Sequence, residues 1–194
     1  TAPGGTVALT RTFRDGFSRF DPYASPWTPH YAHNAYDDWR ARTLTGNGEA
    51  QIYVDPRYRG SGPTPLGLDP FRVGGGTLGL TAQPAPEAAR PYLDGYEYTS
   101  GMISSRTGFT QTYGYFEIRA KLPAGQGLWP AFWLLRPGQW PPEIDVMEYL
   151  GSRPGGIELH AHWSEDGTHR SSGCRVPLAD ATTLLWSHPQ IRSE

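Results

Sequence analysis

The chain has 194 residues, including 24 Gly and 19 Pro, and its 7 Trp, 11 Tyr and 7 Phe make it rich in aromatic rings. So much glycine and proline approaches the composition of disordered chains, but such chains are poor in side chains that need burial. We therefore exclude disorder for most of the chain and expect one turn-rich domain, because two full domains would not fit. With 17 basic and 19 acidic residues, the net charge of -2 argues against nucleic acid and anionic membranes as partners.

The single cysteine, Cys174, excludes an internal disulfide, and no Cys or His spacing indicates a zinc site. No apolar run approaches the roughly 18 residues of a membrane span, and no signal peptide is visible. The composition thus predicts neither a metal site nor a membrane partner.

Alternation of apolar and polar residues recurs at short intervals between turn residues, which is typical of a sandwich or barrel. Segments 51–54 and 76–82 are short examples, and segments 56–70 and 83–97 are the Gly- and Pro-rich loops beside them. In segment 115–122, apolar and charged residues alternate throughout, which predicts a strand with one buried face and one wet face.

Two tryptophans mark segment 127–135, where Trp129 and Trp133 would share one face of a regular strand. Indole rings offer flat apolar platforms with a polar edge, which suit the faces of pyranose rings. The alternative is that these rings pack in the core.

Three carboxylates, Glu143, Asp145 and Glu148, lie among apolar residues in the next strand. Glu143 and Asp145 share a face, whereas Glu148 is an odd number of positions from Glu143 and would point away. A β-bulge at Val146 or Met147 would restore its orientation and bring the glutamate carboxyls to about 5 Å, the spacing of a retaining glycosidase pair. The alternative is a solvated acidic strand face.

Segment 157–163 alternates again and places Glu158, His160 and His162 on one face. Either histidine could be an exposed strand residue without a function. From about Ser172 the alternation stops, and the spacing of apolar residues fits neither strand nor helix.

Segments 127–133 and 143–148 resemble the two signature strands of glycoside hydrolase family 16, Gly-x-Trp-Pro-Ala-Phe-Trp followed by Glu-Ile-Asp-x-Met-Glu. The resemblance covers about residues 10–170, since segments 12–17, 46–53 and 98–123 are also similar to the family pattern. It implies an all-β, concanavalin-like β-jelly roll sandwich. It also implies an endo-acting enzyme that cleaves internal β-linkages of a polysaccharide with retention.

The resemblance also implies the roles of the three carboxylates. Glu143 matches the nucleophile that forms a glycosyl-enzyme, Glu148 the acid/base, and Asp145 the residue that orients the nucleophile. This chemistry requires Glu148 to hold a proton while Glu143 is ionised. Repulsion between nearby carboxylates can move their pKa values apart and so produce this difference.

The bulged spacing is similar to that of laminarinases, agarases, carrageenases and bacterial exopolysaccharide depolymerases. We therefore expect a β-1,3- or mixed-linkage glucan, or a related exopolysaccharide, as substrate. Trp129 and Trp133 are expected to bind it, His162 matches a histidine beside the cleft of β-1,3-glucanases, and Asn47 and Arg106 fall where relatives place polar groups toward sugar hydroxyls.

The resemblance implies that no cofactor is required. A structural calcium ion is frequent in the family, but no acidic residue near the C-terminus matches its usual ligands. We expect a monomer that acts outside the cell or in the periplasm, where such polymers occur.

The later family motifs cannot be read after residue 172, so we expect a partial catalytic domain over residues 1–172, a divergent tail over 173–194 and a C-terminally incomplete fold. Two function classes stay open. The intact carboxylates favour an active endo-β-glycanase, whereas the missing C-terminal pattern favours a carbohydrate-binding or inactive truncated remnant.

Overall fold

A computed structural model describes residues 8–31, 33–178 and 184–185, and the chain divides into two compact units, Thr1–Thr110 and Gln111–Glu194. Strands dominate, and the helical elements of the described residues are three single turns of 3-10 helix: η1 (Trp39–Ala41), η2 (Thr45–Asn47) and η3 (Arg90–Tyr92). None of the described helices has the length and apolar character needed to cross a membrane.

The first unit contains a three-stranded sheet in the order β1 (Gln51–Tyr53), β5 (Tyr98–Ser100), β4 (Gln83–Pro84). β1 and β5 run parallel, whereas β4 and β5 are antiparallel. β1 confirms the strand predicted at 51–54, and it contributes Ile52 to the core of this unit.

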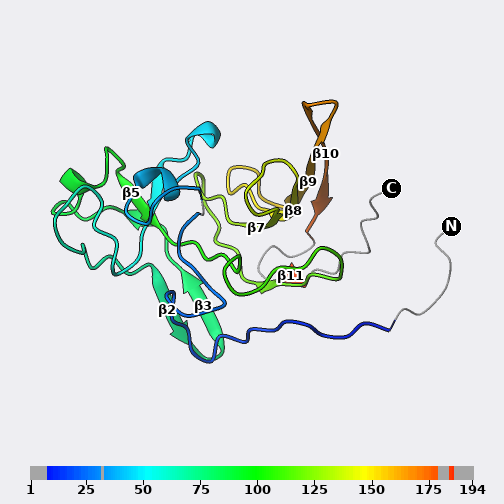
Figure 1. Cartoon of the computed structure of the whole chain (residues 1–194), viewed down its shortest axis with the longest axis horizontal. Coiled ribbons are helices and arrows are strands. Elements are labelled where there is room, and N and C mark those ends of the chain that lie inside the picture. Colours follow the sequence, from blue (N-terminus) through cyan, green and yellow to red (C-terminus); the bar gives the residue numbers. More distant parts are fainter. Residues whose placement is uncertain (1–7, 32, 179–183, 186–194) are drawn as a thin grey trace. The chain divides into compact units, whose positions relative to one another are not determined.

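A separate hairpin of the first unit joins β2 (Phe71–Gly74) to β3 (Thr77–Leu80), as Figure 1 shows. Gly75 and Gly76 form its turn with φ of 57° and 72°, which the primed two-residue turn requires and which side chains with a Cβ rarely adopt. β3 confirms the strand predicted at 76–82.

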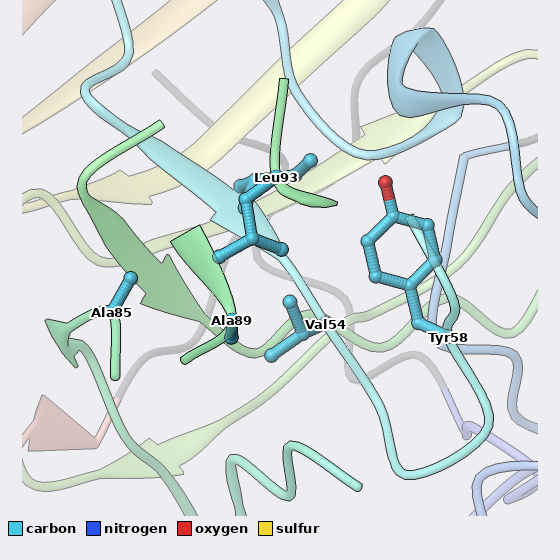
Figure 2. Close-up of a cluster of buried hydrophobic side chains, with 6 residues drawn as sticks. Val54, Tyr58, Ala85, Ala89 and Leu93 are labelled. Carbon is cyan, nitrogen blue, oxygen red and sulfur yellow. The ribbon is translucent and has the colours of Figure 1, made fainter. Parts of the chain in front are cut away.

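The first unit has a buried apolar cluster, which Figure 2 shows in close-up. Its members come from β1 and from the two loop segments that follow it: Ile52, Val54, Tyr58, Ala85, Ala89 and Leu93. The Gly- and Pro-rich loops are therefore anchored by packing and not merely tethered at their ends.

The first unit also buries an ion pair. The Arg42 guanidinium lies 2.6 Å from an Asp55 carboxylate oxygen, and both side chains are fully buried. Tyr23 and Tyr36 donate hydrogen bonds from their hydroxyls to Asp55. Burial alone would raise the pKa of Asp55, but the Arg42 charge and these hydrogen bonds lower it below its ordinary value.

The second unit contains a four-stranded antiparallel sheet, seen as neighbouring ribbons in Figure 1. Its strands lie in the order β10 (Thr168–Pro177), β9 (Gly156–Glu165), β8 (Glu143–Glu148), β7 (Ala131–Leu135). β9 confirms the strand predicted at 157–163. Asp166 and Gly167, with φ of 50° and 74°, form the two-residue turn that leads from β9 into β10.

Segment 115–122 forms less strand than predicted. Only β6 (Arg119–Ala120) is a strand, because these two residues are the ones that pair with β11 (Leu184–Leu185). The predicted division into faces nevertheless holds, since Leu122 is buried with Met147, Tyr149 and Ile157 while the charged residues of the segment are exposed.

β10 continues as a strand to Pro177, past Ser172, where the sequence pattern stops. Almost all of its side chains are exposed, so the strand has no buried face that would select apolar residues at alternate positions. The expected loss of strand structure after Ser172 was therefore wrong for 173–177. Most of the predicted tail, 179–183 and 186–194, lies outside the described residues.

Candidate active site

A bulge in β8 gathers the three carboxylates on one face of the sheet. Asp145 pairs with His160 and Glu148 with Glu158, so three steps along β8 match two steps along β9. On the other side, β7 skips Val146 when it pairs with β8. The structure thus confirms the predicted bulge and assigns the extra residue to Val146.

Asp145 lies within 4.8 Å of both glutamates, measured between carboxylate oxygens. Only 5% of its surface is exposed. Burial, the charges of Glu143 and Glu148 and a hydrogen bond with Glu143 raise the pKa of Asp145 to about 7. At neutral pH, Asp145 is therefore protonated in a large fraction of molecules and donates its proton to Glu143.

Glu148 is held by two side chains from outside β8. Trp129 donates from Nε1 to Oε1 at 2.9 Å, and the Nδ1 atom of His160 lies 2.9 Å from Oε2. Since indole only donates, a proton on Glu148 belongs on Oε2, where His160 can accept it. The two oxygens of this carboxyl therefore differ in what they can do.

Glu143 has a different indole partner. Trp140 donates from Nε1 to Oε2 of Glu143 at 2.8 Å, and its side chain is otherwise exposed. A hydrogen bond to the ionised form favours a carboxylate in the charged state that a nucleophile needs. The sequence analysis missed Trp140, although its position just before the acidic strand was a usable signal.

His162 lies opposite Glu143 on β9, and its Nε2 atom is 3.3 Å from Oδ2 of Asp145. Its Nδ1 atom is 3.0 Å from Nε2 of His169 on β10. His160 and His162 share one face of β9, as predicted, and each contacts a different carboxylate of β8. His169 was missed because β10 was not recognised as a strand, although the Asp-Gly turn before it is a hairpin signal.

Gly173 makes room for His160 on the neighbouring strand. A Cβ atom at this position would lie 2.2 Å from Cδ2 of His160 and 2.6 Å from the carbonyl oxygen of Leu159. Since glycine leaves this space open, the His160 ring fits beside β10 and reaches Glu148.

The two predicted tryptophans, Trp129 and Trp133, lie at the acidic face but belong to different parts of the backbone. β7 begins at Ala131, so Trp129 precedes the strand and reaches the face through its bond to Glu148. Trp133 lies within β7 directly opposite Asp145, which places its side chain on the same face. With 46% of its surface exposed, Trp129 retains an open ring face.

Asn47 and Arg106 belong to the first unit, where both are exposed. Asn47 ends η2, and the backbone amide of Arg106 donates to Oγ of Ser104 at 3.4 Å. Their assignment to sugar hydroxyls stays a prediction.

Carboxylates and imidazoles are also metal ligands, and two such sets occur among the described residues. Glu143, Asp145 and His162 form one, and Asp145, Glu148 and His160 form the other, each with ligand atoms within 4.8 Å of one another. Both sets include Asp145, whose proton is shared with Glu143 and would have to leave before a metal could bind. Hydrogen bonds explain the short distances, and we assign no metal to either set.

Comparison with known proteins adds a family match over residues 74–190 to the model of Glycosyl hydrolases family 16. The match passes through Ser172 and includes most of the segment that the sequence analysis treated as a divergent tail. A domain boundary at residue 172 stays a prediction.

Two curated relatives come from Rhizobium meliloti (strain 1021). Endo-1,3-1,4-beta-glycanase EglC is 41% identical over 192 residues, which cover 94% of this chain and 40% of the relative. Endo-1,3-1,4-beta-glycanase ExsH is 44% identical over 158 residues, which cover 78% of this chain and 33% of the relative. The chain thus spans less than half the length of either relative.

Among solved structures, the chain is similar to SCLam, a non-specific endo-beta-1,3(4)-glucanase from the same family, in a crystal with a bound oligosaccharide. The TM-score is 0.67 at 27% identity, and the match covers 96% of this chain and 72% of that chain. This likeness confirms the all-β jelly-roll fold that the sequence predicted.

Proposed function

Because the chain belongs to glycosyl hydrolase family 16, as its motifs predicted, we propose that it hydrolyses internal β-linkages of a polysaccharide with retention of the anomeric configuration. The observation that carries the proposal is the bulge at Val146, which places Glu143, Asp145 and Glu148 on one face and Asp145 between the two glutamates. A binding protein would have no need for a carboxylate with a pKa near 7 at this place.

In the first step, Glu143 attacks the anomeric carbon while Glu148 gives its proton to the departing glycosidic oxygen. Trp140 holds one oxygen of Glu143, which leaves the other oxygen to form the new bond. Trp129 at Oε1 and His160 at Oε2 hold the Glu148 carboxyl in place for this transfer.

In the second step, Glu148 takes a proton from water, which attacks the glycosyl-enzyme and releases Glu143 as a carboxylate. The ester formed by Glu143 has no negative charge, so one of the causes that raise the pKa of Asp145 is absent in the intermediate. When the carboxylate returns, Asp145 can again donate to it and stabilise it as the leaving group. These steps require no metal or cofactor.

The proposed substrate is a β-1,3- or mixed-linkage glucan or a related exopolysaccharide. The relatives described above, endo-1,3-1,4-beta-glycanases and an endo-beta-1,3(4)-glucanase, support this choice. Trp129 and Trp133 supply ring faces beside the carboxylates for stacking against the sugar. Since these polymers lie outside cells, the proposal includes an extracellular or periplasmic enzyme.

The test is release of reducing ends from laminarin, mixed-linkage glucan, agarose and an acidic exopolysaccharide. We expect the parent to release oligosaccharides and Glu143→Gln to lose at least about 10⁴-fold in kcat, since it removes the nucleophile. Glu117→Gln is the matched control, because it makes the same change at an exposed position of the same unit.

Binding of these polymers without release by the parent would contradict the enzyme proposal and support the sugar-binding alternative. The anomer formed first, followed by proton NMR, tests the mechanism separately. A product with inverted configuration would exclude the covalent step on Glu143.

A further inference from the structure

His169 lies outside the acidic strand and its facing strand, yet it contacts the site. It follows the Asp166-Gly167 turn at the start of β10 and is exposed. Its ring is nearly parallel to that of His162, with centroids 5.2 Å apart and planes at 17°. The 3.0 Å distance between Nε2 of His169 and Nδ1 of His162 is that of a hydrogen bond.

A second contact fixes where the His169 ring lies. The ring centroid of Trp140 is 4.7 Å from that of His169, and the same indole donates to Glu143. His169 therefore packs against both the ring that binds the nucleophile and the ring that contacts Asp145, and these two rings also lie beside each other with centroids 6.1 Å apart.

A neutral imidazole has one N–H group, so the bonds made by His162 determine its tautomer. Nε2 of His162 lies 3.3 Å from Oδ2 of Asp145, and if the Asp145 proton points to Glu143 this oxygen can only accept a proton from the imidazole. Nδ1 of His162 is then an acceptor, and His169 must donate to it from Nε2. In this series of contacts, His169, His162 and Asp145 each donate in the direction of Glu143.

We propose that His169 is a positioning residue for the nucleophile, because it holds His162 in the tautomer that donates from Nε2 to Asp145. This inference rests on the proposed function, in which Glu143 attacks the sugar. Without His169, His162 can carry its proton on Nδ1 and accept the Asp145 proton at Nε2. Glu143 then loses the hydrogen bond that orients it.

The direct test is the tautomer of His162, read by long-range proton–nitrogen NMR correlation in protein labelled with ¹⁵N-histidine at neutral pH. The chain has six histidines, so single substitutions can assign each signal. We expect the Nε2–H form of His162 in the parent and a mixture or the Nδ1–H form in His169→Ala. An Nδ1–H form in the parent, or no change in His169→Ala, would overturn the inference.

The kinetic test uses the substrate that the parent cleaves. We expect His169→Ala to lower kcat about tenfold with KM nearly unchanged, because the loss of one orienting hydrogen bond is worth about 1.4 kcal/mol in the transition state. His169→Gln keeps an amide donor and should recover most of kcat and the Nε2–H tautomer. Arg170→Ala is the control, since Arg170 neighbours His169 but pairs with Glu165 in an exposed contact.

Equal kcat in the parent and His169→Ala would refute the positioning role, as would a failure of His169→Gln to recover either readout. If the parent cleaves none of the polymers, the proposed function fails, while the tautomer measurement still decides whether His169 controls His162. The two failures are therefore distinguishable.

Discussion

Two buried aspartates, one in each unit, have the same side chain and similar burial but opposite pKa shifts. Asp55 is 0% exposed and Asp145 is 5% exposed. Arg42 and two tyrosine hydroxyls surround Asp55 and lower its pKa, whereas Asp145 lies between two glutamates and its pKa rises to about 7. Burial by itself raises the pKa of both aspartates, and the glutamates add to that rise at Asp145, whereas at Asp55 the Arg42 charge and the hydrogen bonds outweigh it.

This difference separates a structural group from a functional one. Asp55 has a fully satisfied environment, and its charge helps to hold the segments around it in place. Asp145 lies near like charges. This arrangement does not contribute to the stability of the fold, but it keeps a proton on Asp145 that can be donated to Glu143. The same substitution should therefore have opposite effects on stability at the two positions.

The largest effect on stability is expected for Asp55→Asn. It leaves the Arg42 guanidinium buried without its counter-ion, and breaking such a pair destabilises a protein by about 3–5 kcal/mol. Urea unfolding followed by tryptophan fluorescence checks the change in the free energy of unfolding. Asp37→Asn is the control, because Asp37 pairs with Arg59 in a partly exposed contact. Equal losses for the two variants would contradict the structural role of Asp55.

Asp145→Asn should stabilise the protein at high pH while impairing it as an enzyme. Because the folded state raises the pKa of Asp145 to about 7, the folded state binds more protons than the unfolded state between about pH 4 and pH 7. The free energy of unfolding of the parent should fall with pH across this window.

Asn does not titrate, so the gain in the free energy of unfolding of Asp145→Asn over the parent should be absent below about pH 4. It should be complete above about pH 7, at up to about 4 kcal/mol. We expect kcat to fall by at least about 100-fold because the proton shared with Glu143 is lost. Melting temperatures and kcat measured across the pH range check both effects. A variant less stable than the parent at pH 8 would contradict the comparison.

Trp129→Phe tests the acid/base with a smaller change. The ring remains, but Glu148 loses the donor to Oε1 and keeps only the contact of His160 with Oε2. The loss of a hydrogen bond to a carboxylate is worth about 1.5 kcal/mol, and we expect kcat to fall about tenfold. Trp163→Phe is the control, since Trp163 is an exposed ring at the far end of β9. Parallel losses in the two variants would argue against a specific role for Trp129.

The smallest effect on kcat is expected for Gly173→Ala, which adds one methyl group beside His160. The group cannot fit without moving both the ring and the Leu159 carbonyl, so His160 should lose its contact with Glu148. We expect a stability loss of about 1–3 kcal/mol from overpacking, and a change of severalfold in kcat that disappears in the background of His160→Ala. Additive losses in the double variant would show that Gly173 acts elsewhere.

The acidic face could be predicted from sequence because its signal is local. Three carboxylates at an odd spacing within one strand required a bulge, and alternation placed His160 and His162 on one face. The Arg42–Asp55 pair could not be predicted, because its members are 13 positions apart and follow no period. His169 escaped because an exposed strand carries no apolar alternation. The strand predicted at 115–122 was mostly wrong because alternation predicts faces, whereas a strand also needs a hydrogen-bonding partner.

The bulge at Val146 has a consequence for how this site can be lost. Side chains at odd and even positions of a strand point to opposite faces. The side chain at position 146 therefore matters less than the fact that a residue is present there between Asp145 and Glu148. Deletion of a single codon here would turn Glu148 toward the core while every catalytic residue type remained in the gene. Such a chain would keep all three carboxylates, but they would no longer lie on one face of the sheet. Homologues of this protein should therefore be compared by the number of residues between Asp145 and Glu148 as well as by their identities.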